Sequence, residues 1–560
     1  MTIQTVPSAQ TTQTARNPDA FPTLDASAIE RVMRHGAVCH AATGEILAEQ
    51  GKPMEYFVVI VDGEAVVELT TNSRTELIAT HGPGEFFGDV HLLSGRPSLV
   101  QSRMVKAGRI VKVRRSDLKS LMQGDAELSE IFMRAFLLRR MELLASSAGD
   151  VIVLGSLNSA GTLRIRDFLS RNGYPYTFVD LEKERDVQKL LDQFHISVAD
   201  IPVLIHGQKP VLKNPSNEEI TRTLGFNDSV SEHEVRDVVI VGAGPAGLSA
   251  AVYGASEGLD TLLLEAKAPG GQAGASSRIE NYLGFPNGIS GLELASRAYE
   301  QVQKFGAEFL VARSAALLKC DTRPYQLITV DGITIRSRTV VIATGARYRK
   351  LPLEDLTKFE GVGIYYGAAA IEAQMCKGKD VIIVGGGNSA GQAAIFLSRH
   401  ASNVHILIRA ASLESSMSRY LVQRIKETPN ITLNPRTEIV ELKGERCLEF
   451  VKLRNNETGE SWERPCNHVF LMTGASPNTD WLRGSVSLDD KGFIVTGANL
   501  TEDQLKTAGW SLERRPYLLE TSVPGVFAAG DVRAGSVKRI ASGVGEGALS
   551  ISFVHQTFNG

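Results

Sequence analysis

The sequence predicts a multidomain α/β protein, on the basis of its length, its composition and two glycine-rich patterns. The chain has 560 residues, of which 43% are hydrophobic and 22% are charged. This composition is typical of globular domains, and at roughly 150 residues per domain the length predicts about four compact units. Two segments of the second half each combine an apolar strand, a G-x-G turn and the start of a helix. We therefore expect two Rossmann-type folds, preceded by a β-roll and a smaller α/β domain.

The first 148 residues divide into a tail and a β-rich domain. Residues 1–21 are rich in Thr and Gln, which predicts a disordered tail. In residues 22–148, short apolar runs such as 57–61 and 65–69 alternate with glycine turns, and helical periodicity closes the segment at 128–144. This pattern predicts a β-roll followed by helices.

Residues 149–226 change to an alternation of strands and helices. The expected strands are 151–155, 176–181 and 201–205, and the expected helices are 162–172 and 185–194. This alternation predicts a small α/β domain. The polar segment 227–233 is the expected linker to the rest of the chain.

The first glycine-rich pattern follows the apolar strand that ends at Val241. Its turn consists of Gly242, Gly244, Pro245, Ala246 and Gly247. Gly242 makes the tight turn, Gly244 lets the backbone approach a pyrophosphate, and Gly247 permits close packing of helix and strand. The next strand ends about 20 residues later in Glu265, which is placed to accept hydrogen bonds from ribose hydroxyls. A first dinucleotide site is therefore expected here.

The second pattern begins at Gly385. The residues expected to hold a second dinucleotide are Gly385, Gly387, Asn388, Ser389, Ala390 and Arg409. Ala390 stands where the third glycine is expected, a replacement that close packing tolerates. The following strand ends in Arg409 where the first pattern ends in an acid, and a cation there suits the 2′-phosphate of NADPH better than the free ribose of NADH. NADPH is therefore the expected second cofactor, with NADH as the alternative.

Two further strand ends predict where the rest of a flavin lies. Thr344 and Gly345 follow the apolar strand 339–342, and Gly530 and Asp531 follow an expected strand near the C-terminus. Asp531 is placed to bind the ribityl or phosphate region beside another helix start. This combination resembles the flavoprotein disulfide reductases that carry two dinucleotide domains, and it makes FAD the expected first cofactor.

Residues 236–560 resemble low-molecular-weight thioredoxin reductases over almost their whole length. The segments that carry the resemblance are Gly270–Gln272, Ile279–Pro286, Val384–Ala390 and Thr521–Asp531. The resemblance adds Gly271, Gln272 and Asn281 to the expected FAD site. It implies an FAD domain of residues 234–348 and 473–560, with an NADPH domain of residues 349–472 inserted in it. It also implies a homodimer and rotation of the domains during turnover.

The resemblance breaks at the expected redox centre. That family carries a C-x-x-C motif just before the glycine-rich strand of the NADPH domain, and its two positions correspond here to Tyr366 and Ala369. Dithiol chemistry needs one thiolate to attack and a second thiol to resolve, and neither is present in this region. The catalytic residues therefore stay unknown.

Cysteine usage and charge limit the compartment and the partners. The five cysteines are scattered and form no C-x-x-C, a pattern typical of reduced thiols in the cytosol. The formal charge of −3, without a long basic run, gives no indication of a nucleic-acid partner. No metal-ligand spacing involves the histidines. We therefore expect a cytoplasmic protein without a membrane span or a metal site.

The β-roll resembles a cyclic-nucleotide-binding domain through the cassette 84–98. The residues expected to meet the nucleotide are Gly88, Asp89 and Arg96. In that family an acid, here Asp89, binds the ribose 2′-hydroxyl, and an arginine neutralises the cyclic phosphate. Ser98 stands at the arginine position, which leaves Arg96 or Arg103 to compensate. Because an unpaired phosphate in a buried pocket is costly, two hypotheses stay open: a nucleotide site, or a scaffold retained for dimerisation or docking.

Residues 149–226 resemble the glutaredoxin and thioredoxin fold. Ile201-Pro202 matches the cis-proline turn of that fold. The loop 156–161, where the redox motif should follow the first strand, contains no thiol. This domain is therefore expected to bind a partner and not to exchange thiols.

Three functions are compatible with the sequence. The first is an FAD-dependent oxidoreductase that takes hydride from NAD(P)H and reduces an unidentified acceptor. The second is a thioredoxin-disulfide reductase that uses the thiols of a partner, or distant cysteines brought together by the fold. The third is a non-enzymatic, flavin-bearing redox sensor or interaction protein.

Overall fold

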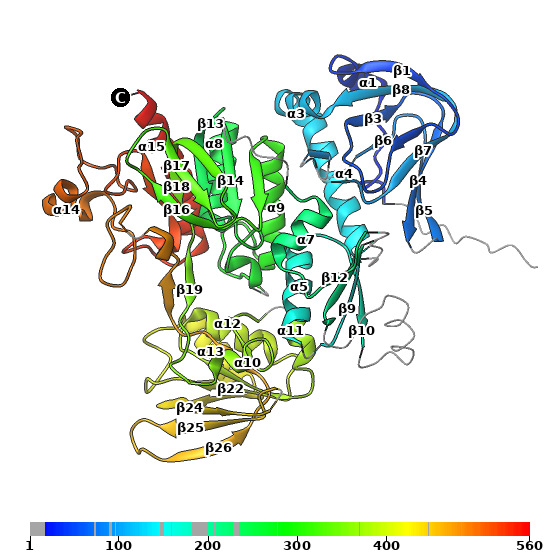
Figure 1. The fold of residues 1–560 in the computed structure, drawn as a ribbon. Coiled ribbons are helices and arrows are strands. Elements are labelled where there is room, and N and C mark those ends of the chain that lie inside the picture. Colours follow the sequence, from blue (N-terminus) through cyan, green and yellow to red (C-terminus); the bar gives the residue numbers. More distant parts are fainter. Residues whose placement is uncertain are drawn as a thin grey trace, which may run out of the picture. The chain divides into compact units, whose positions relative to one another are not determined.

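The computed structural model of the protein contains two compact units, residues 1–149 and 150–560, which are described one at a time (Figure 1). The described residues are 17–71, 74–88, 92, 93, 95, 97–145, 151–157, 159–181, 200–206, 209–227, 234–276, 278–368, 370–445, 447–482 and 484–559. The predicted helix 185–194 and most of the predicted tail lie outside these residues. Ala20 is fully buried, so the ordered chain begins before the predicted boundary at residue 22.

The first unit is the predicted β-roll, built from two four-stranded antiparallel sheets. Their orders are β1-β8-β3-β6 and β2-β7-β4-β5. The elements are α1 (Ala26–Met33), β1 (Ala37–Ala41), β2 (Ile46–Ala48), β3 (Tyr56–Ile60), β4 (Glu64–Thr71), β5 (Arg74–His81), β6 (Phe86–Phe87), β7 (Gln101–Lys106), β8 (Gly108–Arg114), α3 (Arg115–Gly124) and α4 (Ala126–Ala145). Phe57, Phe86 and Phe132 pack in its core with ring centroids 4.7 to 5.3 Å apart, a spacing at which aromatic rings attract one another.

The second unit begins with a small four-stranded sheet of order β10-β9-β11-β12, called here the small fold (residues 151–227). The elements are β9 (Val151–Gly155), α5 (Ala160–Arg171), β10 (Thr177–Asp180), β11 (Val203–His206), β12 (Leu212–Lys213) and α7 (Asn217–Leu224). β10 lies parallel to β9, and β11 is antiparallel to both β9 and β12. The Ile201–Pro202 peptide bond is cis, as predicted. The assignment to the thioredoxin fold itself stays a prediction.

The outer Rossmann fold is built on a seven-stranded sheet. Its elements are β13 (Val235–Val241), α8 (Pro245–Ser256), β14 (Thr261–Glu265), α9 (Gly291–Lys304), β15 (Glu308–Val311), β16 (Ala315–Lys319), β17 (Tyr325–Thr329), β18 (Thr334–Ile342), α14 (Glu502–Thr507), β29 (Val526–Ala528) and α15 (Ile540–Asn559). The order is β15-β14-β13-β18-β17-β16, and β29 also pairs with β18. The central parallel strands are apolar and almost fully buried, because helices cover such sheets on both faces.

The inserted Rossmann fold has five parallel strands in the order β20-β27-β21-β22-β23. Its elements are α10 (Leu356–Phe359), β20 (Ile364–Tyr365), α11 (Ala370–Met375), β21 (Asp380–Val384), α12 (Asn388–Leu397), β22 (Asn403–Leu407), α13 (Arg419–Glu427), β23 (Ile431–Asn434) and β27 (Val469–Leu471). A three-stranded antiparallel sheet of β24 (Thr437–Lys443), β25 (Phe450–Asn455) and β26 (Ser461–Pro465) completes it.

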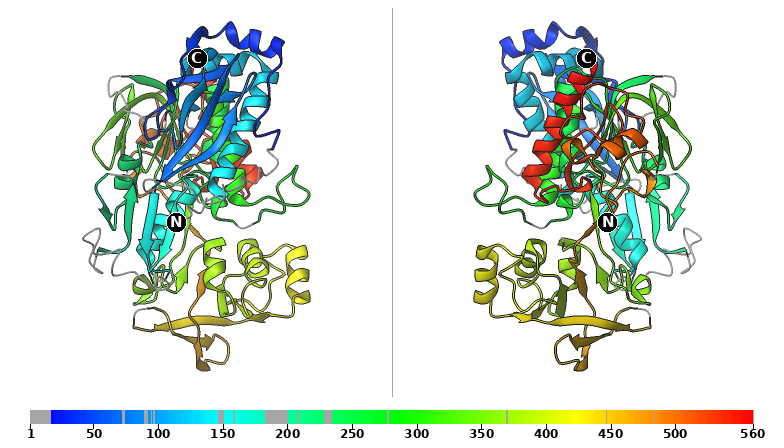
Figure 2. Two further views of the ribbon diagram at one scale, coloured as in Figure 1. Left: turned by 90° about the vertical axis from the view of Figure 1, so that its right-hand side faces the viewer. Right: turned by 90° about the vertical axis from the view of Figure 1, so that its left-hand side faces the viewer.

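The chain passes between the two Rossmann folds twice, through β19 (Ala346–Tyr348) and β28 (Ala475–Pro477). These two strands pair with each other as an antiparallel ribbon, and both views of Figure 2 show the inserted fold, in yellow, at the end of this connection. Among the helices of the described ranges, none has the length and hydropathy that crossing a membrane requires.

Candidate functional site

The first glycine turn joins β13 to α8 with no room for side chains inside it. Gly242 has φ +104°, and a Cβ there would lie 2.5 Å from the carbonyl oxygen of Ala343. A Cβ on Gly247 would lie 1.7 Å from the carbonyl oxygen of Gly242. Gly244 caps α8 and Pro245 opens it. Apart from the adjoining backbone, no heavy atom of the described residues lies within 4 Å of the position of a Cβ on Gly244. The helix N-terminus is therefore open at the point where a phosphate would approach its backbone N–H groups.

Glu265 lies beside this turn at the end of β14. Its carboxylate accepts the backbone N–H of Ala243 at 2.7 Å and that of Lys267 at 2.9 Å. These bonds fix the carboxylate next to the turn, and each of its oxygens keeps further acceptor capacity. A ribose diol needs acceptors of this kind.

The loop at Gly271 covers the first turn. A Cβ on Gly271 would lie 3.0 Å from the Cα of Gly244, so the two backbones approach closely. The side-chain amide of Gln272 donates to the carbonyl of Ala346, at the start of the ribbon between the folds. The structure thus places Gly271 against the first turn and Gln272 beside the ribbon between the folds, and their role at a flavin stays a prediction.

Thr344 and Gly345 are held by a residue that the sequence did not reveal. The Asn478 side chain donates to the carbonyl of Thr344 at 2.9 Å, and the Thr344 hydroxyl donates to the carbonyl of Asn478, also at 2.9 Å. The backbone N–H of Asn478 donates to the carbonyl of Gly345 at 3.0 Å. Asn478 follows β28 directly, and only the pairing of β28 with β19 shows that the two segments meet.

Asp531 lies on the other side of the same helix start. A Cβ on Gly530 would lie 3.0 Å from the Cβ of Ala246, and the Gly530 N–H donates to Glu546 at 2.7 Å. The Asp531 carboxylate accepts no hydrogen bond from any residue of the described ranges, and burial raises its pKa. A half-buried carboxylate with unused lone pairs fits a ligand that carries hydroxyl groups.

Asn281 is separated from this group. It is exposed in a loop whose neighbour Leu283 is 92% exposed. The contacts of this loop lie elsewhere: Ile279 pairs with Ile289 within the loop, and Glu280 forms an ion pair with Arg424 of the inserted fold. The structure therefore brings together the predicted flavin-site residues other than Asn281.

The second glycine turn joins β21 to α12. Gly385 has φ +141°, and a Cβ there would lie 2.3 Å from the carbonyl oxygen of Met472. Gly387 caps α12, and within the part of the chain that the structure describes no heavy atom beyond the adjoining backbone lies within 4 Å of the position of its Cβ. Asn388 turns its side chain inward and accepts hydrogen bonds from the backbone N–H and the hydroxyl of Ser418, at 2.8 and 2.9 Å.

The remaining predicted residues of the second turn lie in different environments. Ala390 is fully buried against the sheet, Ser389 is exposed at the helix start, and Arg409 is exposed beyond the end of β22 at Leu407. Arg409 forms no ion pair within the part of the chain that the structure describes. Its guanidinium is thus available to an external anion.

Tyr366, at one of the two positions expected for cysteine, belongs to a polar chain. Its hydroxyl donates to Glu360 Oε1 at 2.7 Å, and Lys350 Nζ lies 2.6 Å from the same oxygen. Burial and this carboxylate raise the pKa of Tyr366, so the phenol stays protonated. Ala369, the second position, lies outside the described residues.

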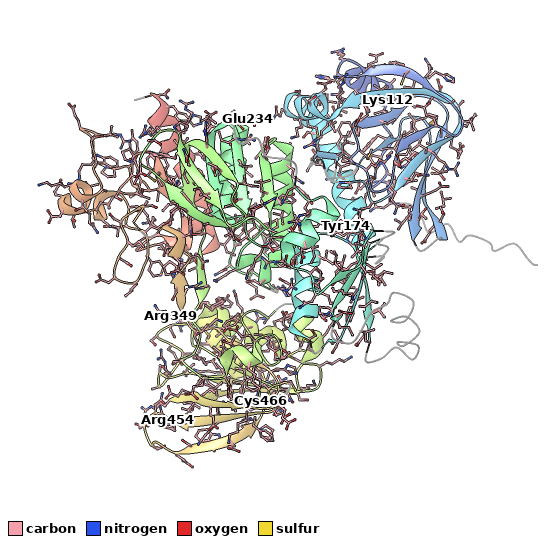
Figure 3. All side chains as sticks on the ribbon, viewed as in Figure 1. Lys112, Tyr174, Glu234, Arg349, Arg454 and Cys466 are labelled. Atoms are coloured by element: carbon pink, nitrogen blue, oxygen red, sulfur yellow. The ribbon has the colours of Figure 1, made fainter. Side chains whose placement is uncertain are left out.

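All five cysteines are free, and the two in the core of the inserted fold are unreactive by environment. Cys376 and Cys466 are 0% and 4% exposed (Figure 3 labels Cys466). Burial raises the pKa of Cys376 to about 12 and that of Cys466 to about 11. Because the thiolate is the reactive form, neither side chain offers a nucleophile near neutral pH.

The cassette of the β-roll has its described polar groups engaged within the protein. Ser98 is buried and donates to the carbonyl of Val100 at 2.8 Å, and Arg103 binds Glu68 through two nitrogens at 2.9 and 2.6 Å. Arg139 of α4 donates to the carbonyl of Gly88 at 3.0 Å. Asp89 and Arg96 lie outside the described residues. Arg103 thus already has a carboxylate partner within the β-roll.

Comparison with protein families matches residues 236–547 to the family described as pyridine nucleotide-disulphide oxidoreductase. Residues 38–125 match the cyclic nucleotide-binding domain. These two matches cover the Rossmann folds and the β-roll.

Similar proteins agree with the first match. A thioredoxin reductase of Treponema pallidum is 34% identical over 314 residues, which cover 56% of this chain and 94% of the relative. The 34.2 kDa protein in the rubredoxin operon of Clostridium pasteurianum is 30% identical over 331 residues, which cover 59% of this chain and all of the relative. The solved thioredoxin reductase of T. acidophilum is 32% identical with a TM-score of 0.51, over 58% of this chain and 99% of that structure.

Proposed function

Because the chain belongs to the pyridine nucleotide-disulphide oxidoreductase family, we propose that it moves hydride from NAD(P)H to FAD and then reduces an acceptor without a dithiol of its own. It is a thioredoxin reductase-like flavoprotein enzyme with a cyclic nucleotide-binding domain at its N-terminus. Bound FAD supplies the chemistry, because it accepts a hydride and releases two electrons. The residues of the chain bind, orient and shield the reacting rings.

The first glycine turn is proposed as the FAD site. The proposed residues are Gly242, Gly244, Pro245, Ala246, Gly247, Glu265, Gly271, Gln272, Asn281, Thr344, Gly345, Gly530 and Asp531. Three observations support this assignment: the open N-terminus of α8, the fixed carboxylate of Glu265 and the unused acceptor oxygens of Asp531. They match the pyrophosphate, the ribose diol and the ribityl hydroxyls of FAD in that order.

The second turn is proposed as the NADPH site, with NADH as the alternative donor. The proposed residues are Gly385, Gly387, Asn388, Ser389, Ala390 and Arg409. Support comes from the open backbone at Gly387 and from the exposed guanidinium of Arg409. A guanidinium binds a 2′-phosphate with charge-assisted hydrogen bonds, which a free ribose hydroxyl cannot form.

The observation that carries the proposed reaction is the polar chain at the expected dithiol position. The Tyr366 hydroxyl donates to Glu360, which also pairs with Lys350, and a protonated phenol can neither attack a disulfide nor form one. The alternative of a thiol pair assembled from distant cysteines is poorly supported, since Cys376 and Cys466 are buried with raised pKa values. A partner that carries its own disulfide fits the role of acceptor, because the disulfide takes up two electrons and two protons to become a dithiol.

The decisive experiment is anaerobic stopped-flow absorbance of the flavin-loaded protein mixed with NADPH and, separately, with NADH. Rapid bleaching of the flavin band supports the enzyme, and oxidised thioredoxin as the only added acceptor then tests the disulfide reductase. A flavin band that both nicotinamides leave oxidised overturns the proposal in favour of a flavin-bearing sensor. Tyr366→Phe serves as a control, because a flavin that reacts directly with its donor keeps its reduction rate in this variant.

The other expectations stay predictions; the cytoplasmic location follows from the cysteine usage and the rest follow from the resemblances. They are a homodimer, a cytoplasmic location, a thioredoxin-like small fold that binds a partner, and a cyclic nucleotide bound by Gly88, Asp89 and Arg96. The scaffold hypothesis for the β-roll stays open beside the nucleotide site, since Arg103, one of the two candidate cations, is paired with Glu68.

A further inference from the structure

The N-terminal end of helix α5, in the small fold, contacts the inserted Rossmann fold (Figure 1). The Cβ of Ala160 lies 2.7 Å from the place where a Cβ of Gly361 would be, so only a glycine leaves room for the helix there. One turn further along, Leu163 packs against the hydrophobic core of the inserted fold. Gly361 precedes β20, the edge strand that leads to Tyr366.

The C-terminal end of α5 holds the outer Rossmann fold by two hydrogen bonds. Arg171 Nη2 donates to the carbonyl of Gly271 at 2.8 Å, and Asn172 Nδ2 donates to the carbonyl of Lys267 at 3.2 Å. The Arg171 side chain is 14% exposed and Asn172 is 2% exposed. Both acceptors belong to the loop that covers the first glycine turn.

A separate contact fixes the small fold on the outer fold. The Asn227 side chain donates to the carbonyl of Val311 and accepts its N–H, both at 2.8 Å. Asn227 therefore pairs with the end of β15 much as a neighbouring strand would. With this anchor and the two bonds of Arg171 and Asn172, α5 cannot slide along the outer fold without losing hydrogen bonds.

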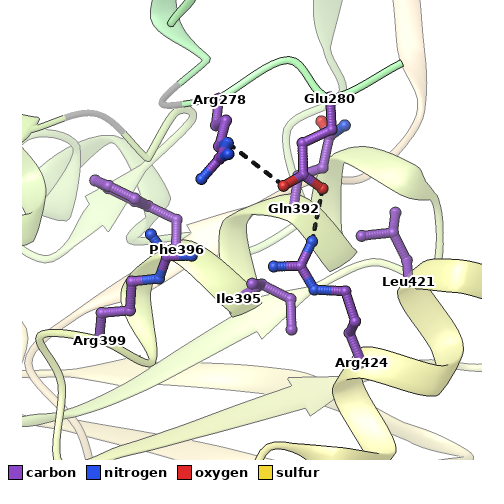
Figure 4. Close-up of a pocket in the computed structure, with 8 residues that line it drawn as sticks. All are labelled: Arg278, Glu280, Gln392, Ile395, Phe396, Arg399, Leu421 and Arg424. Carbon is purple, nitrogen blue, oxygen red and sulfur yellow. Dashed lines mark hydrogen bonds and ion pairs between the residues drawn. The ribbon is translucent and has the colours of Figure 1, made fainter. Parts of the chain in front are cut away.

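A weaker bridge joins the two Rossmann folds directly. Glu280 of the outer fold lies 2.7 Å from Arg424 of α13 and 3.4 Å from Arg278, at the wall of a small pocket shown in Figure 4. These side chains are 23%, 37% and 43% exposed, and exposed ion pairs contribute little stability. The pair is compatible with the orientation that α5 holds but cannot enforce it.

We propose that α5 is a strut that fixes the angle between the two Rossmann folds, so that the domain rotation implied by the resemblance does not occur in this chain. A helix of 12 residues spans about 18 Å as a rigid rod, and each of its ends is tied to a different fold. Rotation of the inserted fold would pull Leu163 out of its core or break the bonds of Arg171 and Asn172. A chain without a dithiol at Tyr366 has no thiol pair of its own in the inserted fold that a rotation would have to bring to the flavin. The inference concerns geometry alone and holds whether or not nicotinamides reduce the flavin.

The test is hydrogen–deuterium exchange measured by mass spectrometry on the full flavin-loaded chain. Arg171→Ala releases the end at the outer fold, and Leu163→Ala loosens the end at the inserted fold. The reporting segments are 267–274, where the Gly270 N–H donates to Ala243, and 361–366, where the Gly361 N–H donates to Ile364. If α5 is a strut, loosening one of its ends also loosens the other. Each variant is therefore expected to speed amide exchange about tenfold in the segment at the mutated end and at least about threefold in the segment at the other end.

Arg164→Ala is the matched control on the same helix. Its guanidinium donates to Asn214, Pro215 and Asn217 of the small fold itself, so both segments should keep their wild-type exchange. A change confined to the mutated end overturns the proposal, because α5 would then be only a local contact. If Arg171→Ala does not fold, Leu163→Ala decides the question alone, since it leaves the bonds to Gly271 and Lys267 in place.

Discussion

The two glycine turns share one backbone design, but they differ in what surrounds them. At the first turn, Glu265, the loop at Gly271 and Asp531 come from distant parts of the chain and close around the start of α8. At the second turn, the start of α12 is open, Ser389 is exposed and Arg409 has no ion-pair partner in the described ranges. The first turn is thus enclosed by several segments, whereas the second turn is open.

This difference matches what each dinucleotide has to do. A flavin that stays bound through many turnovers gains from a site made of many segments, because every one of them must move before it leaves. A nicotinamide must arrive and depart in each turnover, so an open turn with one cation suits it. Substitutions at matched positions of the two turns can break or sharpen this comparison.

The largest effect is expected from Gly247→Ala in the first turn. Its Cβ would lie 1.7 Å from the carbonyl oxygen of Gly242, so the backbone must shift. Overpacking of this kind typically costs about 1–3 kcal/mol of unfolding free energy, and the displaced turn should also lose its flavin. Thermal unfolding and the ratio of flavin to protein absorbance measure both changes.

The matched control lies at the equivalent position of the second turn, which already carries an alanine. Ala390→Gly should cost about 1 kcal/mol through helix propensity and leave the flavin content unchanged. Equal flavin loss in the two variants would show that the two turns do not serve different cofactors.

The next largest effects are expected from alanine at the second glycine of each turn, where the two substitutions should affect different cofactors. Among the described residues, neither Gly244 nor Gly387 has a heavy atom beyond the adjoining backbone within 4 Å of the position of a Cβ. Alanine therefore fits the protein and fills only the space that a pyrophosphate would use. Gly244→Ala should yield a folded protein with little flavin, whereas Gly387→Ala should keep its flavin and bind NADPH at least about tenfold more weakly. Flavin content and the NADPH concentration that half-saturates the bleaching rate distinguish them. The opposite result, with flavin lost in Gly387→Ala and NADPH binding weakened in Gly244→Ala, would exchange the two proposed sites.

A smaller and more selective effect is expected from Arg409→Ala. Loss of a hydrogen bond to a charged group costs about 1.5–3 kcal/mol, which corresponds to about 10- to 150-fold weaker NADPH binding. NADH lacks the 2′-phosphate and serves as the internal control, so its binding should change by less than about twofold. A parallel loss for both donors would mean that Arg409 supports the fold and does not read the phosphate.

Local patterns made both turns predictable from the sequence. β13 and β21 each close with a short apolar run that a glycine follows, and the helices start where Gly244 and Gly387 predict. Ile201–Pro202, the β-roll and the replacement of cysteine by Tyr366 were equally local features.

The residues that close the first turn were beyond such patterns. Asn478 binds Thr344 from far along the chain, and Glu546 reaches Gly530 from α15. Neither residue has a local motif, because its role depends on which strands pair and which helices cross. The contacts of α5 with Gly361 and Gly271 also join segments remote in sequence, so only the folded chain shows that the thiol-free small fold touches both Rossmann folds.

The smallest effect concerns Asp531 and has opposite signs with and without the flavin. Burial raises its pKa above the unfolded value, so its contribution to stability is full at low pH and is lost as the pH rises through the folded pKa. Asp531→Asn removes the cost of burying a charged carboxylate, so the flavin-free variant should melt at a slightly higher temperature than wild type at pH 7. Below about pH 4, where an ordinary Asp is protonated, the two should melt at the same temperature. With flavin bound, the order should reverse, because the amide replaces a charged acceptor by a weaker neutral one. Melting curves of both forms at the two pH values measure this, and Asp490→Asn at an exposed aspartate is the control. If the flavin-free variant is no more stable than wild type at pH 7, the Asp531 carboxylate is already solvated. The surroundings of the first turn are then more open than the contacts indicate.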